Sequence, residues 1–287
     1  MTDHGLPALY ALLTWWFSTG VILYLDGLPR WTFRWSMAGA TAVLGLSFWG
    51  LANSAQDTTV SGAYMAFTWA LLVWGWMEIS FYMGVVTGPR RHACETGCSG
   101  WKHFGHALMV SLHHEIAIVL GGLLVAALTW ASPNQVGLWT YVILAVMHES
   151  ARLNVFLGVP NVTEEFLPPH LDYLRSFIRK RSINPLLPVS VTLGTCAATM
   201  LCTAALAPEA GAFDQAAFTF LGVLMIIAVA EHFFLVLPLN VGAMWTWSLK
   251  GRAPLVVPDA DQIIDVVKLA EAPRVQAHKP AGNGLRA

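Results

Sequence analysis

Four glutamates lie inside long apolar stretches of this sequence, and three of them stand directly beside a histidine. Ionisable side chains inside membrane segments are costly, so they usually mark a functional site. Carboxylate oxygens and neutral imidazoles together form a good ligand set for iron, manganese or zinc. We therefore treat seven residues as candidate metal ligands: Glu78, His114, Glu115, His148, Glu149, Glu231 and His232.

The spacing of these residues leaves three interpretations open. Adjacent residues on a helix point about 100° apart, so one member of each His–Glu pair faces a given site. The other member supports the ligands, as do the nearby His113 and Arg152. The cluster is a mono- or binuclear metal site, a structural network of protonated carboxylates and histidines, or a place where one histidine binds a tetrapyrrole. Di-iron bundles use Glu-x-x-His pairs, and the adjacent pairs here depart from that pattern.

The elements that must position these residues are membrane helices. Hydrophobic residues make up 56% of the chain and charged residues 11%, whereas a soluble domain carries about 25% charged residues. Apolar runs of this length predict an all-α, polytopic bundle over residues 1–250. Seven spans are expected, at residues 6–25, 37–52, 60–86, 104–130, 136–157, 186–207 and 218–240.

The basic residues predict the orientation of this bundle. Every lysine and arginine except Arg152 falls after the first, third, fifth or seventh expected span. The positive-inside rule then places the N-terminus outside and the C-terminus in the cytoplasm. Counted from the cytoplasmic ends, all four glutamate clusters lie at one level, about 12–15 Å deep.

Two cytoplasmic segments have features beyond those of linkers. Residues 169–182 are expected to form an amphipathic helix on anionic lipids, or an ordinary connector. In the preceding "NVTEEFLPPHL", Glu164, Glu165 and His170 could fold back over the site and meet Asn154, or remain solvated. Residues 251–287 form a tail with a possible short helix at 259–271. The sequence has no nucleic-acid-binding motif.

The cysteines allow a second, weaker metal hypothesis. Cys94 and Cys98 have C-x3-C spacing and are predicted to face the cytoplasm, so a disulfide between them is not expected. With His92 and His103 nearby they could bind zinc, although a second cysteine pair is missing.

Several long strings resemble one known family. They are "WWFSTGVILYLDGLPR", "GAYMAFTWALLVWGWMEISFYMGVVTGPRR", "SPNQVGLWTYVIL", "SARLNVFLGVPNVTEEFLPPHLDYL" and "EHFFLVLPL". They are similar to PuhE, the photosynthetic complex assembly family of purple phototrophic bacteria, over about residues 6–250.

This resemblance implies a multi-pass protein of the bacterial inner, or intracytoplasmic, membrane. It would help assemble reaction-centre and light-harvesting complexes, or match the supply of bacteriochlorophyll to them. The implied partners are subunits of those complexes and pigment-synthesis proteins, and the tetrapyrrole would be bacteriochlorophyll or a precursor. The alternative from the buried cluster is a membrane metalloenzyme, a di-iron-like oxidase or hydroxylase acting on a tetrapyrrole or carotenoid. A proton or solute pathway is a third class, because buried carboxylates serve there too.

Overall fold

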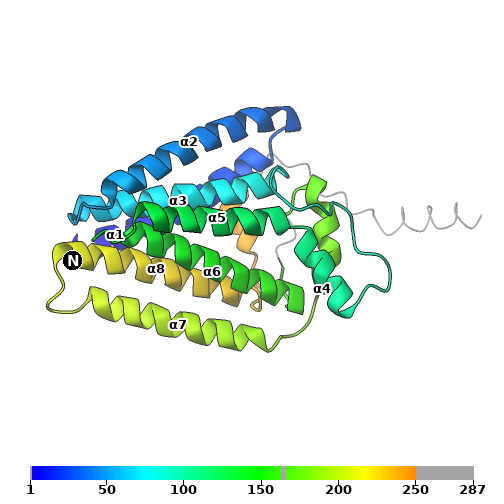
Figure 1. Ribbon diagram of the computed structural model, residues 1–287. Coiled ribbons are helices and arrows are strands. Elements are labelled where there is room, and N and C mark those ends of the chain that lie inside the picture. The colour runs from blue at the N-terminus through cyan, green and yellow to red at the C-terminus, as the bar shows by residue number, and fades with distance from the viewer. Residues whose placement is uncertain (1, 163–165, 250–287) are drawn as a thin grey trace, which may run out of the picture. The chain divides into compact units, whose positions relative to one another are not determined.

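The computed structural model describes residues 2–162 and 166–249, and this part of the chain is helical with no strand. Glu164, Glu165 and the possible tail helix at 259–271 lie outside the described residues. Eight α-helices of ten residues or more follow one another along the chain (Figure 1). They are α1 (Thr2–Asp26), α2 (Phe33–Ser54), α3 (Val60–Tyr82), α4 (Gly100–Met109), α5 (Leu112–Leu128), α6 (Val136–Leu157), α7 (Leu186–Ala205) and α8 (Ala212–Phe234).

Shorter elements join the long helices or follow them. They are the 3-10 helices η1 (Arg30–Thr32), η3 (Pro169–Phe177) and η4 (Val241–Trp245), and the single turn α9 (Thr246–Leu249). The amphipathic segment expected at 169–182 is therefore a 3-10 helix that ends at Phe177. Leu171 and Phe177 are buried against the protein, at 2% and 7% exposure, so its apolar face packs inward. Binding of this segment to anionic lipids stays a prediction.

Five of the described helices are long and apolar enough to cross a membrane: α1, α2, α3, α7 and α8. A sixth span results if α4 and α5 are counted together as one bent span. The polar residues between 148 and 154 make α6 less apolar, and it is not among the five. The chain is thus an all-helical membrane protein, while the exact number of spans and their orientation stay predictions.

The outer surfaces of the helices are apolar, as lipid contact requires. Trp35, Trp49, Leu123, Leu193 and Met200 are all more than 60% exposed. Soluble monomers rarely expose contiguous apolar surface of this kind. The exposed faces of α2, α5 and α7 therefore suit the hydrocarbon of a bilayer.

The core of the bundle lies around α3 and α8. Half of the apolar window of α3 and 56% of that of α8 are buried, compared with 17–22% for α1, α2 and α7. Phe67 of α3 and Phe220 of α8 are fully buried and stack with 4.7 Å between ring centroids. Small residues allow close helix approach at the periphery, since a Cβ on Gly194 of α7 would lie 2.7 Å from Val229 of α8. α3 carries Glu78 and α8 carries Glu231, so both glutamates lie on the two most buried of these helices.

The expected span at 104–130 is broken, and this corrects the prediction of one continuous helix. α4 and α5 meet at Val110–Ser111 with a bend of 61°. The segment after α3 crosses the break, where the backbone N–H of His114 donates to the Thr87 carbonyl at 2.9 Å. A Cβ on Gly88 would collide with the Met109 carbonyl oxygen and lie 2.6 Å from the Val110 carbonyl carbon. The close backbone approach at Gly88 thus accompanies the break and fixes the first turn of α5, which carries His114.

Asn134 closes the opposite end of the bundle, where α2, α3 and α6 meet. Its side chain is fully buried, and its amide nitrogen donates to the carbonyls of Ser54, Asp57 and Gly62 at 2.9–3.0 Å. Buried carbonyl groups need such partners, because an unpaired one costs about 1–3 kcal/mol. One side chain therefore ties the end of α2 and the start of α3 to the start of α6.

The start of α3 has its own local cap. The Thr59 hydroxyl accepts a hydrogen bond from the backbone of Gly62 at 3.1 Å, as an N-cap residue does. The carboxylate of the half-buried Asp57 accepts a hydrogen bond from the Thr59 backbone N–H at 2.9 Å. Hydrogen bonds from Thr59 lower the pKa of Asp57, because they favour its charged form.

Candidate functional site

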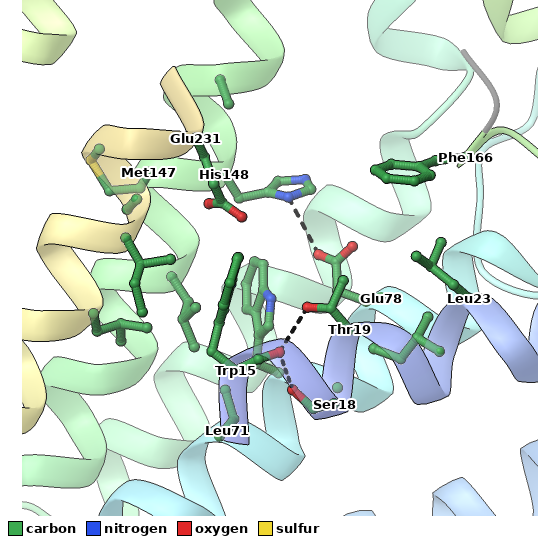
Figure 2. A pocket seen from close by; sticks show the side chains of 18 of the residues that line it. Trp15, Ser18, Thr19, Leu23, Leu71, Glu78, Met147, His148, Phe166 and Glu231 are labelled. Carbon is green, nitrogen blue, oxygen red and sulfur yellow. Dashed lines mark hydrogen bonds and ion pairs between the residues drawn. The ribbon is translucent and has the colours of Figure 1, made fainter. Parts of the chain in front are cut away.

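A cavity of about 330 Å³ lies among α1, α3, α6 and α8. Glu78, His148 and Glu231 bring polar groups to its wall, and Trp15 and Trp245 add aromatic surface. Figure 2 shows the carboxylates of Glu78 and Glu231 and the imidazole of His148 directed toward one space. The volume falls at the lower end of the range for small-molecule sites, about 300–1,000 Å³. An apolar cavity with a few convergent polar groups is the usual form of such a site.

Three of the candidate ligands, from three helices, come together beside this cavity, and two of them, Glu78 and His148, line it. The Nδ1 atom of His148 lies 3.3 Å from Oε1 of Glu78. The rings of His148 and His114 are 5.7 Å apart between centroids. One donor atom from each of Glu78, His114 and His148 lies within 4.8 Å of the others. α3, α5 and α6 therefore deliver one carboxylate and two imidazoles to a single point.

His114 is the most constrained member of this group. Its side chain is 1% exposed, and neither ring nitrogen has a hydrogen-bond partner among the described residues. Phe81 covers one side of the ring, with 4.6 Å between centroids. Leaving a buried polar group unpaired costs about 1–3 kcal/mol. A metal ion or a water molecule at the Glu78–His148 pair would satisfy one of these nitrogens.

Trp74 helps to hold His148. The Trp74 ring meets the His148 ring edge to face at 5.3 Å between centroids. Trp74 in turn packs against the fully buried Tyr141, whose hydroxyl donates to the Ile118 carbonyl at 2.8 Å. The sequence offered no sign that Trp74, Phe81 or Tyr141 would take these places, because only the helix register decides which aromatic residues face the cluster.

Glu115 and Glu149 belong to a separate charged group. The Arg152 guanidinium donates to Glu115 and to the Ser111 hydroxyl, and it lies 3.5 Å from Glu149. None of these four residues lines the cavity. The structure therefore separates Glu115 and Glu149 from Glu78, although all of them were grouped as candidate ligands. Arg152 carries one positive charge, so it balances one of these two carboxylates.

His232 also lies apart from the cavity wall. Its Nδ1 donates to the Ala228 carbonyl at 2.8 Å, and its Nε2 lies 2.9 Å from the Ser150 hydroxyl. Ser150 continues to Ser190 at 2.8 Å, and Asn154 donates to Ser190 at 3.1 Å. Both imidazole nitrogens are occupied, so this histidine joins α6, α7 and α8 through a structural network. Asn154 belongs to that network, and its expected contact with the 163–170 loop, part of which lies outside the described residues, stays a prediction.

The remaining described candidates lie either on the surface or in the segment next to the cavity. His113 is exposed on α5 and does not reach the cluster. His170 donates from Nε2 to the Tyr82 carbonyl at 2.8 Å, which docks η3 onto the end of α3. Phe166, the described residue just after the undescribed 163–165, lines the cavity. Phe166 thus lines the cavity, and His170 attaches η3 to the end of α3.

This arrangement can bind a metal ion through a carboxylate and two imidazoles. Three protein ligands leave coordination positions open, which is the form of catalytic rather than structural sites. Glu231 lines the same cavity without belonging to the ligand group, and so provides a second carboxylate near a bound molecule. The fold and the site together define a polytopic helical membrane protein with a largely apolar cavity among its helices, into which a few polar groups converge.

Comparison with known proteins then gives the family. Residues 1–255 match the family described as "Protein of unknown function (DUF3623)", and the chain belongs to it. A relative from Rhodobacter capsulatus is 39% identical over 272 residues, covering 93% of this chain and 97% of the relative. Its name is "Uncharacterized 30.4 kDa protein in puhA 5'region". No solved structure matches the chain.

Proposed function

We propose that this protein is an inner-membrane factor for assembly of photosynthetic reaction-centre and light-harvesting complexes, or for matching bacteriochlorophyll supply to them. The observation that carries the proposal is the 39% identity, along nearly the whole chain, to a protein named by its place in the puhA 5′ region. That gene context agrees with the resemblance to PuhE. The multi-helix membrane architecture suits a protein that meets membrane-embedded pigment complexes.

The Glu78–His114–His148 group is the part of the molecule that we assign to this role. A metal ion there would face the cavity, in reach of a small molecule or of the polar group of a larger one. The cavity lies against Trp15, Trp74 and Trp245, whose flat apolar rings suit an unsaturated ring or chain. Bound pigment, precursor or metal would be recognised by the same few residues.

The test is deletion of the gene in a phototrophic host, followed by complementation. Near-infrared absorbance of isolated membranes measures reaction-centre and light-harvesting complexes separately from total extracted pigment. We expect deletion to lower the complexes, the wild-type chain to restore them, and Glu78→Gln to fail. Glu209→Gln is the matched control, because Glu209 is exposed in the connection between α7 and α8. Unchanged complexes after deletion would refute the proposal.

The convergence of one carboxylate and two imidazoles also favours a second candidate, a membrane metalloenzyme acting on a tetrapyrrole or carotenoid. An enzyme predicts that the deletion strain accumulates a defined precursor, whereas an assembly factor predicts normal pigments in fewer complexes. Chromatography of extracted pigments separates the two. A precursor that disappears on complementation with wild type, but not with Glu78→Gln, would establish the enzyme.

The broken α4–α5 helix favours a third candidate, a proton or solute pathway, because interrupted helices line transport sites. The break lies directly before His114. Proton flux in liposomes containing the purified chain tests this candidate. Flux that Glu78→Gln abolishes and Glu209→Gln retains would favour it over both others.

A further inference from the structure

A second group of metal-binding side chains lies away from the cavity, where the segment after α3 meets α4. Cys94 and Cys98 come from the segment, and His103 and His106 come from α4. Residues three apart lie on the same face of a helix, so both histidines point the same way. The spacing is C-x3-C-x4-H-x2-H, which sequence reasoning approached only through His92 and His103. In the structure His92 is exposed, and His106 lies beside the cysteines in the position that was predicted for His92.

The distances between donor atoms in this group match a tetrahedral zinc site. Nδ1 of His106 lies 3.5 Å from Sγ of Cys94 and 3.4 Å from Sγ of Cys98. The donor atoms of these three residues all lie within 4.8 Å of one another. Zinc–sulfur bonds of about 2.3 Å and zinc–nitrogen bonds of about 2.0 Å place S and N about 3.5 Å apart in a tetrahedron. Both sulfur–nitrogen separations therefore already match those that zinc requires.

His103 approaches Cys94 from the buried side, outside the three residues whose donor atoms all lie within 4.8 Å of one another. Its Nδ1 lies 3.4 Å from Sγ of Cys94, and its side chain is 5% exposed. Phe156 and Phe177 hold the ring by stacking, each with 5.4 Å between centroids. Its Nε2 is buried without a partner among the described residues, so the sulfur contact is the polar contact that orients the ring.

We propose that Cys94, Cys98, His103 and His106 bind one zinc ion. Two sulfurs and two imidazole nitrogens in tetrahedral arrangement select zinc, and structural zinc sites are closed by four protein ligands. An all-cysteine iron–sulfur cluster needs four cysteines, and only two of the four gather here. A Rieske cluster takes two cysteines and two histidines on different irons, whereas here the Nδ1 atom of each histidine lies within 3.5 Å of a cysteine sulfur, as ligands of one ion do. All four cysteines of the chain are free thiols.

The zinc ion would fix the cover of the cavity. The Cys94 backbone N–H donates to the Ser176 hydroxyl of η3 at 2.9 Å, and His103 contacts Phe177 of the same element. η3 also carries His170, which binds the end of α3 beside the cavity. Zinc would therefore join the segment after α3, α4 and η3 into one rigid cap. This inference stands on its own contacts and does not depend on the proposed function.

The test counts zinc in the full chain purified in mild detergent, by plasma mass spectrometry. We expect the Cys94→Ser, Cys98→Ser double variant to contain about one zinc fewer per chain than the wild type. The matched control is Cys196→Ser with Cys202→Ser, which changes two thiols on α7 and should keep the zinc. Equal zinc in the first variant and the wild type overturns the site, as does wild-type protein without zinc.

Cobalt substitution reports on the metal ligands directly, and its absorption spectrum does not depend on how much of a variant protein accumulates. Cobalt in a tetrahedral site with thiolate ligands gives intense thiolate-to-metal absorption. His106→Asn should weaken cobalt binding about ten- to one-hundred-fold, and His103→Asn should do the same. An unchanged spectrum and affinity in His103→Asn would overturn the four-ligand assignment, and an unchanged His106→Asn would overturn the site.

Discussion

Nδ1 of His148 lies 3.3 Å from Oε1 of Glu78, and this contact joins α6 to α3 at the wall of the cavity. The two side chains are 28% and 14% exposed. The distance suits an ion pair, or two ligands that bind the same metal ion. It is not a hydrogen bond, since Oε1 of Glu78 has no hydrogen-bond partner among the described residues. A cation between them would hold both groups without moving either helix.

The Arg152–Glu115 pair should matter for stability and leave metal binding unchanged. Glu115→Gln leaves the Arg152 charge only partly compensated, by the more distant Glu149. We expect a loss of about 1–3 kcal/mol in unfolding free energy. Thermal unfolding in detergent measures the loss, and metal counting on the same sample checks the site. If the Glu115→Gln chain keeps its stability but loses metal, Glu115 is a metal ligand after all.

His232 should likewise behave as a structural residue. His232→Phe keeps a flat ring but removes both hydrogen bonds, to Ala228 and to Ser150. Two net hydrogen bonds are worth about 1–3 kcal/mol together, so the melting temperature should fall. Metal content per folded chain should stay the same. If His232→Phe melts like wild type and loses metal instead, the network assignment is wrong.

Gly88 should control the position of His114. In Gly88→Ala the new Cβ meets backbone atoms of Met109 and Val110, which cannot rotate away. The break between α4 and α5 must then shift, and both stability and metal content should fall. Gly105→Ala is the control, since nothing lies within 4 Å of its Cβ, and it should be neutral or more stable by up to about 1 kcal/mol. Equal behaviour of the two variants would contradict this view of the break.

Asn134 should be among the residues most important for stability outside the cavity. Asn134→Ala removes a donor shared by three carbonyls, two of them in buried hydrogen bonds, which should cost about 2–4 kcal/mol. Asn53→Ala removes one exposed contact to Trp49 and should cost less than about 0.5 kcal/mol. Unfolding of both variants in detergent gives the comparison, and equal losses would contradict the assigned role.

The predicted orientation is tested by fusions to a reporter that is active only in the periplasm. The reporter should be active after Asn53 or Pro208, which lie at the ends of α2 and α7, and inactive after Lys180. Activity after Lys180 would reverse the orientation and with it the cytoplasmic placement of the cysteine group.

The sequence predicted the helices well, because long apolar runs specify membrane helices without reference to neighbours. Counting depth along three helices also predicted that Glu78, His114 and His148 could meet. The same count grouped Glu115 with them, although its neighbour position turns it about 100° toward Arg152. Depth is readable from one chain, whereas the rotation of each helix depends on packing against the others.

The break at Val110–Ser111 could not be predicted from its own residues. It is accompanied by contacts from Thr87 and Gly88, more than twenty positions earlier, which no local pattern reveals. The role of His106 was accessible, since it lies three residues after His103 on an expected helix. His92 was predicted as a ligand instead, because it lies close to Cys94 in the sequence.

The most direct measurement of the central claim is the metal content of the full chain with and without Glu78. Iron, manganese and zinc are counted per chain in wild type, Glu78→Gln and the exposed control Glu209→Gln. If Glu78, His114 and His148 bind metal, Glu78→Gln should contain about one ion fewer per chain than wild type and Glu209→Gln. Zinc in the cysteine group is common to all three and cancels in the difference. Identical metal content in wild type and Glu78→Gln would contradict the account.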